Sequence, residues 1–362
     1  MTGSRLSGRE RVARTFQRRD HDRVPRFDTY WTDTIARWQD EGLVGGQEAA
    51  LDRLGSDMRF LCPTCDPAPF PGRYQVLEQD EHTRVTLDPW GAILRTWKDR
   101  SGVPAHIGFE CDSRDAWETR FRPVLLAAGT QINLEAARRT ARSVQERKLW
   151  SCLPGHEPFH MMRMMLGDEV ELMAMAEDPE WIRDMSRTFT DALLRNFQAA
   201  LVAGIRPDAV WIYGDMAFNH GTLCSPAMYR QLVWPDHKRL ADWAHANGMQ
   251  MIYHSDGDVS AVIDLYIEAG FDCLHPLEAK TGLDLRDLVG RYGDTLALFG
   301  NVNVVELSSN DRARIEAEVA AKLVAGKSGR CYIYHSDHSV PPGVSWQSYQ
   351  FVIELLDRYG GY

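Results

Sequence analysis

The sequence predicts an α/β fold, a single-domain (β/α)8 barrel of the TIM type over residues 1–362, with a β-hairpin inserted at about residues 75–98. Two observations predict it. From about residue 148 onward, short apolar runs alternate with helical patterns, which is typical of βα units around a parallel sheet. The length of 362 residues also suits a barrel of about 250 residues that carries insertions. No repeat or linker divides the chain into two domains.

The strands are expected at the apolar runs, and the helices at the patterns between them. The runs lie at residues 149–153, 209–213, 249–253, 272–275, 296–299 and 331–334, preceded by weaker candidates at 23–28 and 58–61. Residues 179–204 place apolar side chains on one stripe with a period near 3.6, which predicts a helix packed on the sheet. Ser225 and Pro226 predict the start of the next helix, with a kink near Pro235, and Ser345 predicts the start of the last one.

The segment 75–98 has a different pattern. Residues 83–87 alternate between polar and apolar, residues 88–91 have the composition of a turn, and a second run follows at 92–97. This pattern predicts a β-hairpin, which we expect to form a lid or rim of the barrel.

Composition narrows the classes of function and location. The net charge of −10 argues against a nucleic-acid surface, which is usually basic. The chain has no apolar stretch of the roughly 18 residues that a membrane span needs, and residues 1–19 lack the apolar core of a signal peptide. We therefore expect a cytoplasmic protein. Seven scattered cysteines, an odd number, predict reduced thiols instead of a disulfide framework.

Polar residues follow the predicted strands at their carboxyl ends, where barrel enzymes place their reacting groups. They are Tyr213 and Asp215, His254 and Asp256, His275 and Glu278, Asn301, and His335 and His338. His254 and Asp256 are two residues apart and share one face of a strand. With His338 or His335 they would offer two imidazoles and one carboxylate, a set that suits zinc with an open position or a ferrous ion. The alternatives are a simple hydrogen-bonded His-x-Asp pair, loop capping by Asp215, and a satisfied His275 below the site.

Several aromatic residues and histidines are candidates for substrate contacts. We expect Phe27, Tyr30 and Trp31 to form one wall, although they could equally pack in the core. His160 lies in a methionine-rich stretch, residues 159–165, that is more typical of core packing than of an adaptable wall. His275 and Asn301 complete the set of predicted substrate-binding residues.

The strand-end motifs, taken in order, resemble those of the uroporphyrinogen decarboxylase superfamily. The resemblance covers roughly Arg9 to the C-terminus and is weakest at residues 67–147. It rests on the following motifs: Tyr213-Gly214-Asp215, residues 221–226, Tyr253-His254-Ser255-Asp256-Gly257, His275-Pro276-Leu277-Glu278, Gly300-Asn301-Val302, and residues 337–342. It implies a TIM-barrel enzyme that acts on a small molecule.

Two branches of that superfamily differ in chemistry. The true decarboxylases are metal-free and carry an arginine-rich motif after the first strand, which binds the carboxylates of a tetrapyrrole. The matching residues 25–33 lack those arginines and contain Asp28 and Asp33, which would repel a polyanion. The corrinoid-dependent methyltransferases hold zinc with a His-x-Cys motif and a later cysteine. Here His254 keeps the histidine, while Asp256 and His338 stand where the cysteines would be.

The resemblance therefore implies a methyltransferase with a zinc ion on His254, Asp256 and His338. Harder ligands make the metal a stronger Lewis acid, which favours cleavage of a methyl ether, such as a methoxylated aromatic, with transfer of the methyl group to a corrinoid partner protein. Asp215, Tyr213 and Glu278 are the candidate catalytic residues, as proton donors or substrate anchors. The alternatives are a decarboxylase of a small carboxylated substrate and a non-catalytic binding protein. The resemblance also leaves a homodimer open.

Overall fold

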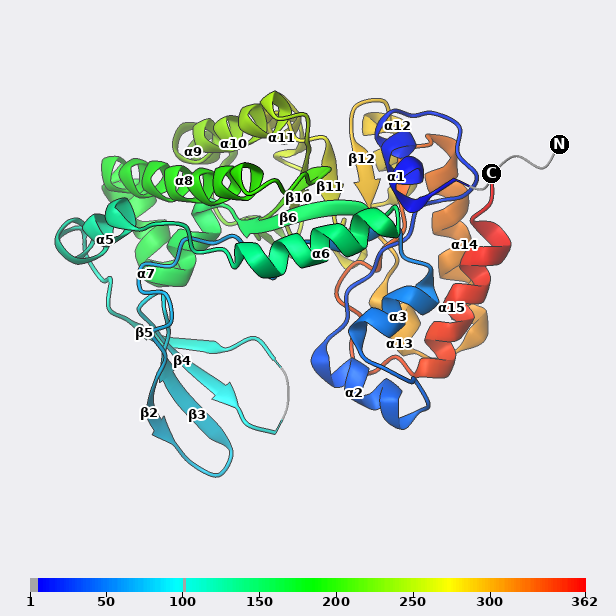
Figure 1. The fold of residues 1–362 in the computed structure, drawn as a ribbon, viewed down its shortest axis with the longest axis horizontal. Helices are drawn as coiled ribbons and strands as arrows, with labels where there is room; N and C mark the ends of the chain where they lie inside the picture. Colours follow the sequence, from blue (N-terminus) through cyan, green and yellow to red (C-terminus); the bar gives the residue numbers. More distant parts are fainter. Residues whose placement is uncertain (1–5, 100–101) are drawn as a thin grey trace.

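A curled parallel sheet forms the centre of the computed structural model, which describes residues 6–99 and 102–362 (Figure 1). All neighbouring strands in it run parallel, which confirms the predicted βα organisation. In sheet order the strands are β1 (Met58–Phe60), β6 (Trp150–His156), β7 (Ala209–Tyr213), β10 (Gln250–His254), β11 (Cys273–His275), β12 (Ala297–Phe299) and β13 (Tyr332–Ile333).

The extended segment around Arg26 connects the two edge strands of this sheet. The backbone N–H of Phe27 donates to the carbonyl oxygen of Tyr334, just beyond β13, at 3.1 Å. On the other side, the N–H of Asp57, just before β1, donates to the carbonyl oxygen of Arg26 at 2.8 Å. The predicted first strand therefore lies between β1 and β13, although it makes only isolated bridges, from Arg23 to Gly361 and from Arg26 to Tyr334. The sheet is curled in the manner of a TIM barrel.

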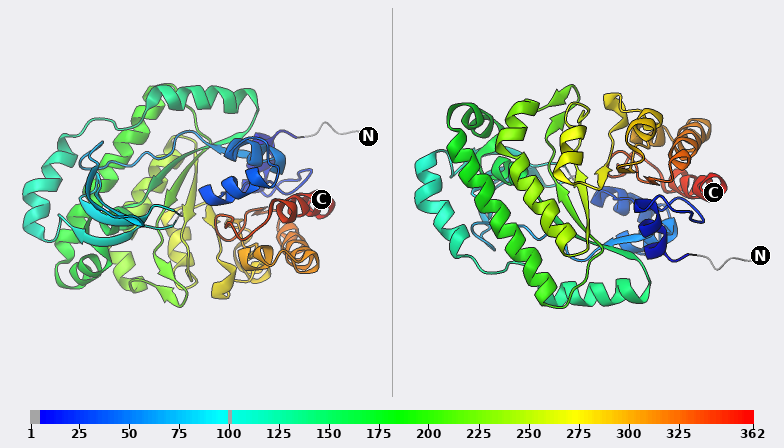
Figure 2. Two further views of the ribbon diagram at one scale, coloured as in Figure 1. Left: turned by 90° about the horizontal axis from the view of Figure 1, so that it is seen from below. Right: turned by 90° about the horizontal axis from the view of Figure 1, so that it is seen from above.

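Helices cover the outside of the curled sheet (Figure 2). The predicted helix from residue 179 is α8 (Pro179–Val202), and the kink near Pro235 separates α9 (Pro226–Leu232) from α10 (Trp234–Ala246). Ser225 caps α9 because its Oγ accepts a hydrogen bond from the N–H of Met228 at 3.1 Å. The other helical elements are α1 (Gly8–Phe16), α2 (Thr32–Asp40), α3 (Gln47–Leu54), α4 (Arg114–Ala116), a π-helical turn (Trp117–Phe121), α5 (Arg122–Ala127), α6 (Leu134–Glu146), α7 (Pro158–Glu177), α11 (Ile263–Ala269), a 3₁₀ turn (Ala279–Thr281), α12 (Leu285–Tyr292), α13 (Val304–Ser308), α14 (Arg312–Ser328) and α15 (Trp346–Tyr359).

The inserted segment is larger than the predicted hairpin. It forms a four-stranded antiparallel sheet of β2 (Gln75–Gln79), β3 (Thr83–Leu87), β4 (Ala92–Trp97) and β5 (Ala105–Phe109), which projects from the body beside α7 (Figure 1). The boundary at residue 98 was wrong because β5 pairs with β4. Phe109 of β5 packs on Gly167 of α7, which has a φ of 75°. A Cβ at Gly167 would lie 2.4 Å from the Phe109 ring, so only glycine fits.

Large aromatic side chains fill the interior of the curled sheet. The Phe27 ring packs edge-on against Phe60, Trp211 and Phe299, with centroids 5.5, 5.9 and 6.3 Å away. His275 lies in contact with this layer, 4.6 Å from the Trp211 ring. The polar strand ends therefore lie next to a packed aromatic core. Among the described helices, none combines the length and the apolar character needed to cross a bilayer.

Candidate active site

Three loops at the carboxyl ends of the strands, here called the barrel mouth, turn sharply through a non-glycine residue. The second residue after β7, β11 and β12 has a positive φ in each case: 47° at Asp215, 60° at Leu277 and 71° at Asn301. Residues other than glycine rarely adopt this backbone conformation. Backbone strain of this kind is concentrated at functional sites. The turn after β7 contains the predicted catalytic residue Asp215, and the turn after β11 directly precedes another, Glu278.

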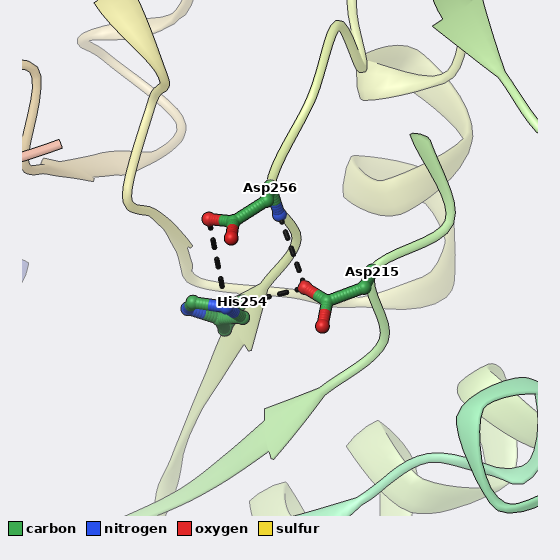
Figure 3. Close-up of side chains that lie close together, drawn as sticks. All are labelled: Asp215, His254 and Asp256. Atoms are coloured by element: carbon green, nitrogen blue, oxygen red, sulfur yellow. Dashed lines mark hydrogen bonds and ion pairs between the residues drawn. The ribbon is translucent and has the colours of Figure 1, made fainter. Parts of the chain in front are cut away.

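Asp215 and His254 form an ion pair at the barrel mouth (Figure 3). His254 Nε2 lies 3.2 Å from Asp215 Oδ1, which also accepts the backbone N–H of Asp256 at 3.2 Å. Burial disfavours the charged form of both groups. The hydrogen bond and the opposite charges outweigh it, so the pKa of Asp215 is lowered and the pKa of His254 is raised. Asp215 is therefore a carboxylate, which favours substrate anchor over proton donor among its two predicted roles.

His275 orients the His254 ring from the side opposite Asp215. The two Nδ1 atoms lie 2.7 Å apart, so one of them donates a hydrogen to the other. Burial, followed by the neighbouring charge of His335, lowers the pKa of His275 well below its usual range and keeps it neutral. This contact directs His254 Nε2 toward Asp215 and Asp256, as a hydrogen-bonded outer partner does for a metal-binding histidine. Since His275 is only 3% exposed, it lies behind His254, away from solvent, and supports that ring.

The second half of the site surrounds Glu278 and His338. His338 Nε2 lies 3.5 Å from Asp256 Oδ2 and 3.7 Å from Glu278 Oε1. Glu278 is 3% exposed and its Oε2 accepts the backbone N–H of Gly257 at 2.6 Å, while Lys280 Nζ lies 2.7 Å from Oε1. Gly257 has a φ of 85°, and a Cβ there would lie 2.4 Å from the carbonyl carbon of Ala217. The bond to Glu278 therefore depends on glycine at this position.

Asp256 is the residue common to both halves. Its Oδ1 lies 3.8 Å from His254 Nε2, whereas its Oδ2 faces His338. The groups Asp215, His254, Asp256 and Asp256, Glu278, His338 each bring their ligand atoms within 4.8 Å of one another. The predicted ligands His254, Asp256 and His338 are thus neighbours, but they divide between two groups that also include the predicted catalytic residues Asp215 and Glu278.

The donor set fits a divalent metal ion. Imidazole nitrogens and carboxylate oxygens are ligands for zinc and ferrous ions. Asp256 Oδ1 is buried and has no hydrogen-bond partner among the described residues, although it faces His254 and Asp215. A cation at this place would satisfy that oxygen.

The sequence of residues 117–359 matches the family described as uroporphyrinogen decarboxylase (URO-D). The chain belongs to this family. A search of curated proteins finds no match. Among solved structures, a methyltransferase from Methanosarcina mazei is similar, with a TM-score of 0.67 and 16% identity over 98% of this chain and 99% of the other. A Xaa-Pro dipeptidase with bound methionine in the active site has a TM-score of only 0.29 at 10% identity, over 65% and 68% of the two chains.

The family match confirms the resemblance inferred from the strand-end motifs, and the Methanosarcina structure supports the TIM-barrel-like fold. At 16% identity, the similarity shows the fold and not the reaction. The reaction of this family member depends on the side chains at its own barrel mouth.

Tyr213 and His160 line the same mouth of this family member. The Tyr213 ring lies between His254 and His156, with centroids 4.7 and 5.4 Å away. Burial raises the pKa of Tyr213, so its hydroxyl stays protonated. His160 Nδ1 is 3.7 Å from Asp215 Oδ2, and burial together with the charge of His156 lowers the pKa of His160 to about 3. Tyr213 and His160 are thus neutral groups beside the Asp215 carboxylate.

Three of the predicted substrate contacts are core residues instead. Phe27 is 3% exposed within the aromatic layer, and Tyr30 is 7% exposed with its hydroxyl 3.1 Å from that of Tyr349. Asn301 is fully buried: its Nδ2 donates to the carbonyl oxygens of Leu277 and Leu283 at 2.7 and 2.8 Å, and Lys322 donates to its Oδ1. Its amide therefore stabilises the turn after β12. Trp31 lies half-buried at the start of α2.

Asp28, from the expected arginine motif, does not face a substrate either. Its carboxyl is fully buried, accepts hydrogen bonds from Ser336 Oγ and the Tyr349 hydroxyl at 2.6 and 2.8 Å, and has a pKa that burial raises. The expected repulsion of a polyanion by Asp28 was therefore wrong. The missing arginines remain the difference from the true decarboxylases.

The pair Asp66 and His156 was not predicted from the sequence. His156 Nδ1 lies 2.6 Å from Asp66 Oδ2, and the His156 ring stacks on His160 with centroids 4.3 Å apart. The predicted strand 149–153 ended too early, because β6 continues through Pro154 and Gly155 to His156. His156, the polar residue at the true end of this strand, was the sequence signal that could have revealed the pair. Lys280, close behind the β11 motif, was missed for a different reason: its Glu278 contact depends on the 3₁₀ turn.

Proposed function

We propose that this protein is a methyltransferase that cleaves a methyl ether and passes the methyl group to a corrinoid carried by a partner protein. The observation that carries the proposal is the cluster around Asp256, where two histidines and three carboxylates meet at the mouth of a URO-D-family barrel. The name of the Methanosarcina methyltransferase is consistent with this choice, but the site chemistry is its main support.

The metal ion, zinc in our proposal, would be held by His254, Asp256 and His338, with Asp215 and Glu278 as the adjoining carboxylates. It would supply Lewis acidity to the ether oxygen. All five residues supply nitrogen or oxygen donors, which favour oxygen substrates over the thiolates that softer sites accept. Lys280 neutralises Glu278 and so limits the negative charge of the cluster.

The leaving oxygen must gain a proton when the C–O bond breaks, since the methyl group departs without its electrons. Burial and the neighbouring Asp215 raise the pKa of Asp256, whereas the pKa of Asp215 is lowered. Two adjacent carboxyl groups with opposite shifts are typical of a division between acid and base roles. Where Asp256 is engaged by a cation, the Tyr213 hydroxyl is the neutral proton donor that remains beside the site.

The aromatic side of the mouth suits a flat substrate. The rings of His156, His160 and Tyr213 pack against one another next to Asp215, and the first two are stacked at an interplanar angle of 22°. A methoxylated aromatic ring could stack here while its ether oxygen reaches Asp256. Arg163, which donates to the Asp215 carbonyl oxygen at 2.7 Å, adds a positive charge at this edge.

The test is a methyl-transfer assay with the zinc-loaded protein, a chemically reduced corrinoid and a panel of methoxylated aromatics. We expect demethylated product together with loss of the reduced corrinoid spectrum. Removal of a proton donor typically costs about 10²- to 10⁴-fold in rate, which sets the expected loss for Tyr213→Phe if this hydroxyl is the donor. His245→Ala is the matched control, because His245 pairs with Asp272 away from the mouth at 2.8 Å. Carbon dioxide release without any corrinoid would refute the proposal.

One observation favours a second candidate, decarboxylation of a small carboxylated substrate. Without a metal, Asp256 keeps a raised pKa and could protonate the carbanion that remains after carbon dioxide leaves. His338 and Lys280 would then attract the substrate carboxylate. This candidate predicts turnover that is insensitive to chelators and independent of a corrinoid.

A further inference from the structure

Cys62 and Cys65 lie in the loop that follows β1, at the same end of the sheet as the candidate active site. The loop runs along β6: the N–H of Leu61 donates to the Cys152 carbonyl oxygen at 3.0 Å, and the N–H of Cys65 donates to the Pro154 carbonyl oxygen at 2.8 Å. The two sulfur atoms are 3.4 Å apart. This Cys-x-x-Cys pair has no part in the proposed methyl transfer.

The two thiols are unequal. Cys65 is 1% exposed, and its carbonyl oxygen accepts a hydrogen bond from Asn196 Nδ2 on α8 at 2.7 Å. Cys62 is half-buried and can be reached by a small molecule. The outer sulfur is therefore the one that solvent-borne reagents meet first, with the inner sulfur fixed behind it.

The contact between them activates the outer thiol. A hydrogen bond from Cys65 lowers the pKa of Cys62 against the opposing effects of burial and Asp66. The same contact, followed by burial, raises the pKa of Cys65 well above its usual range. Thiolate is the reactive form of cysteine, so Cys62 is the nucleophile and Cys65 the second thiol.

We propose that Cys62 and Cys65 form a reversible disulfide with a small hydroperoxide as oxidant. The Cys62 thiolate attacks one peroxide oxygen, the O–O bond breaks, and the other oxygen leaves as an alcohol or water after it takes up a proton. Cys65 then displaces the oxygen from the resulting sulfenic acid as water, and the S–S bond forms. The two sulfurs lose two electrons in total, and the peroxide gains them.

Oxidation of Cys62 and Cys65 would affect the candidate active site through the residue that follows Cys65. Asp66 follows Cys65, and its carboxylate holds His156 twice: Oδ1 accepts the backbone N–H at 2.7 Å and Oδ2 lies 2.6 Å from Nδ1. Bond formation requires the sulfurs to close from 3.4 Å to about 2.05 Å, which moves the chain next to Asp66. Since His156 stacks on His160 and packs on Tyr213, the thiol state changes the aromatic side of the mouth.

The first test counts thiols in the wild-type protein. After brief exposure to a mild excess of hydrogen peroxide and unfolding in an alkylating reagent, we expect a peptide that contains residues 62–65, lacks two hydrogens and escapes alkylation. A dithiol reductant should restore both alkylation sites. Cys62→Ser and Cys65→Ser should each lose this product, while Cys111→Ser, which changes a fully buried thiol, should retain it. The proposal is wrong if both thiols still react with the alkylating reagent after exposure to peroxide. It is also wrong if Cys62 is oxidised to the sulfinic or sulfonic acid without forming a disulfide.

The second test measures the link to the site. Hydrogen exchange of oxidised and reduced wild type should differ in peptides that cover residues 61–66 and 155–160, and not in peptides from α14. Unchanged exchange at 155–160 in fully oxidised protein would overturn the proposed coupling. Both readouts are independent of methyl transfer, so their failure is distinct from failure of the proposed function.

Discussion

Histidine and carboxylate side chains pair at several places in this protein, and two of these places differ clearly in what surrounds the pair. At the barrel mouth, His254 faces Asp215 and Asp256, whose side chains are 32% and 37% exposed. Under α7, His237 Nε2 lies 2.9 Å from Glu157 Oε2, and both side chains are fully buried. The chemical groups are the same in both regions, but only the first can meet a substrate.

The buried pair has its bonding capacity filled. His237 Nδ1 contacts the Tyr229 hydroxyl at 2.8 Å, and Glu157 caps α7 by accepting the N–H of Phe159 at 2.7 Å. The mouth instead leaves Asp256 Oδ1 without a hydrogen-bond partner among the described residues and shifts the pKa values of two adjacent carboxyl groups in opposite directions. The difference indicates that unfilled bonding capacity and access, more than proximity, identify the site.

The largest expected effect separates the two regions by stability. Glu157→Ala removes one partner of a buried pair and a helix cap, which should lower the free energy of unfolding by about 3–5 kcal/mol. His254→Ala should lower it less, by about 1–3 kcal/mol in metal-free protein, because Asp215 and Asp256 are 32% and 37% exposed and water can replace the lost partner. Urea denaturation measures both. Equal losses of stability in the two variants would contradict the distinction between the two regions.

Asn301→Ala tests whether a mouth residue can be structural. We expect a loss of about 1–3 kcal/mol in the free energy of unfolding, because two carbonyl groups and Lys322 lose their buried partner. Metal affinity and substrate KM should stay close to wild type. A large rise in KM at unchanged stability would restore Asn301 as a substrate ligand.

Glu171→Gln probes a third carboxyl, on α7, whose two oxygens are buried without a hydrogen-bond partner among the described residues. Burial raises its pKa well above the usual range. The folded state therefore holds this proton more tightly than the unfolded chain, so the wild type loses stability as pH rises above the pKa of the unfolded chain. Each tenfold difference in proton affinity between the two states corresponds to about 1.4 kcal/mol. The variant should be more stable than wild type at pH 8 and similar at pH 4, as thermal unfolding at both pH values would show.

The last effect concerns metal affinity and its dependence on pH. The pKa of His254 is raised, mainly by the hydrogen bond to Asp215 that outweighs burial, and the pKa of His338 is raised as well. Metal binding must displace these protons, so zinc affinity should fall as pH decreases below the raised values, by up to about tenfold per pH unit for each proton displaced. Competition titrations from pH 5 to pH 8 measure this slope. An affinity independent of pH would contradict the assignment of His254.

Much of the fold could be predicted because βα units leave a strong pattern. The apolar runs at 209–213 and 249–253 became β7 and β10 almost residue for residue, and Ser225 and Ser345 cap the helices they were expected to cap. β5 was missed, because residues 105–109 carry only a short mixed pattern and pair with a strand several residues earlier.

The site was predictable in part for the same reason. Polar residues at strand ends are visible in a sequence, and Asp215, His254, Asp256, Glu278 and His338 do meet at the mouth. Which oxygen of Asp256 faces which histidine depends on loop backbone, such as the turn at Gly257, and no spacing rule encodes it. Phe27, Tyr30 and Asn301 show the converse case, in which a suitable residue type at a suitable place points into the core.

The central claim, that the Asp256 cluster is a metal site, is tested most directly by elemental analysis. We would measure the metal content of wild type, His254→Ala, His338→Ala and the control His245→Ala after purification without chelators and brief incubation with zinc. The account predicts near-stoichiometric metal in wild type and control, and its loss from both mouth variants. Wild-type metal content in either mouth variant, or no bound metal in wild type, would contradict it.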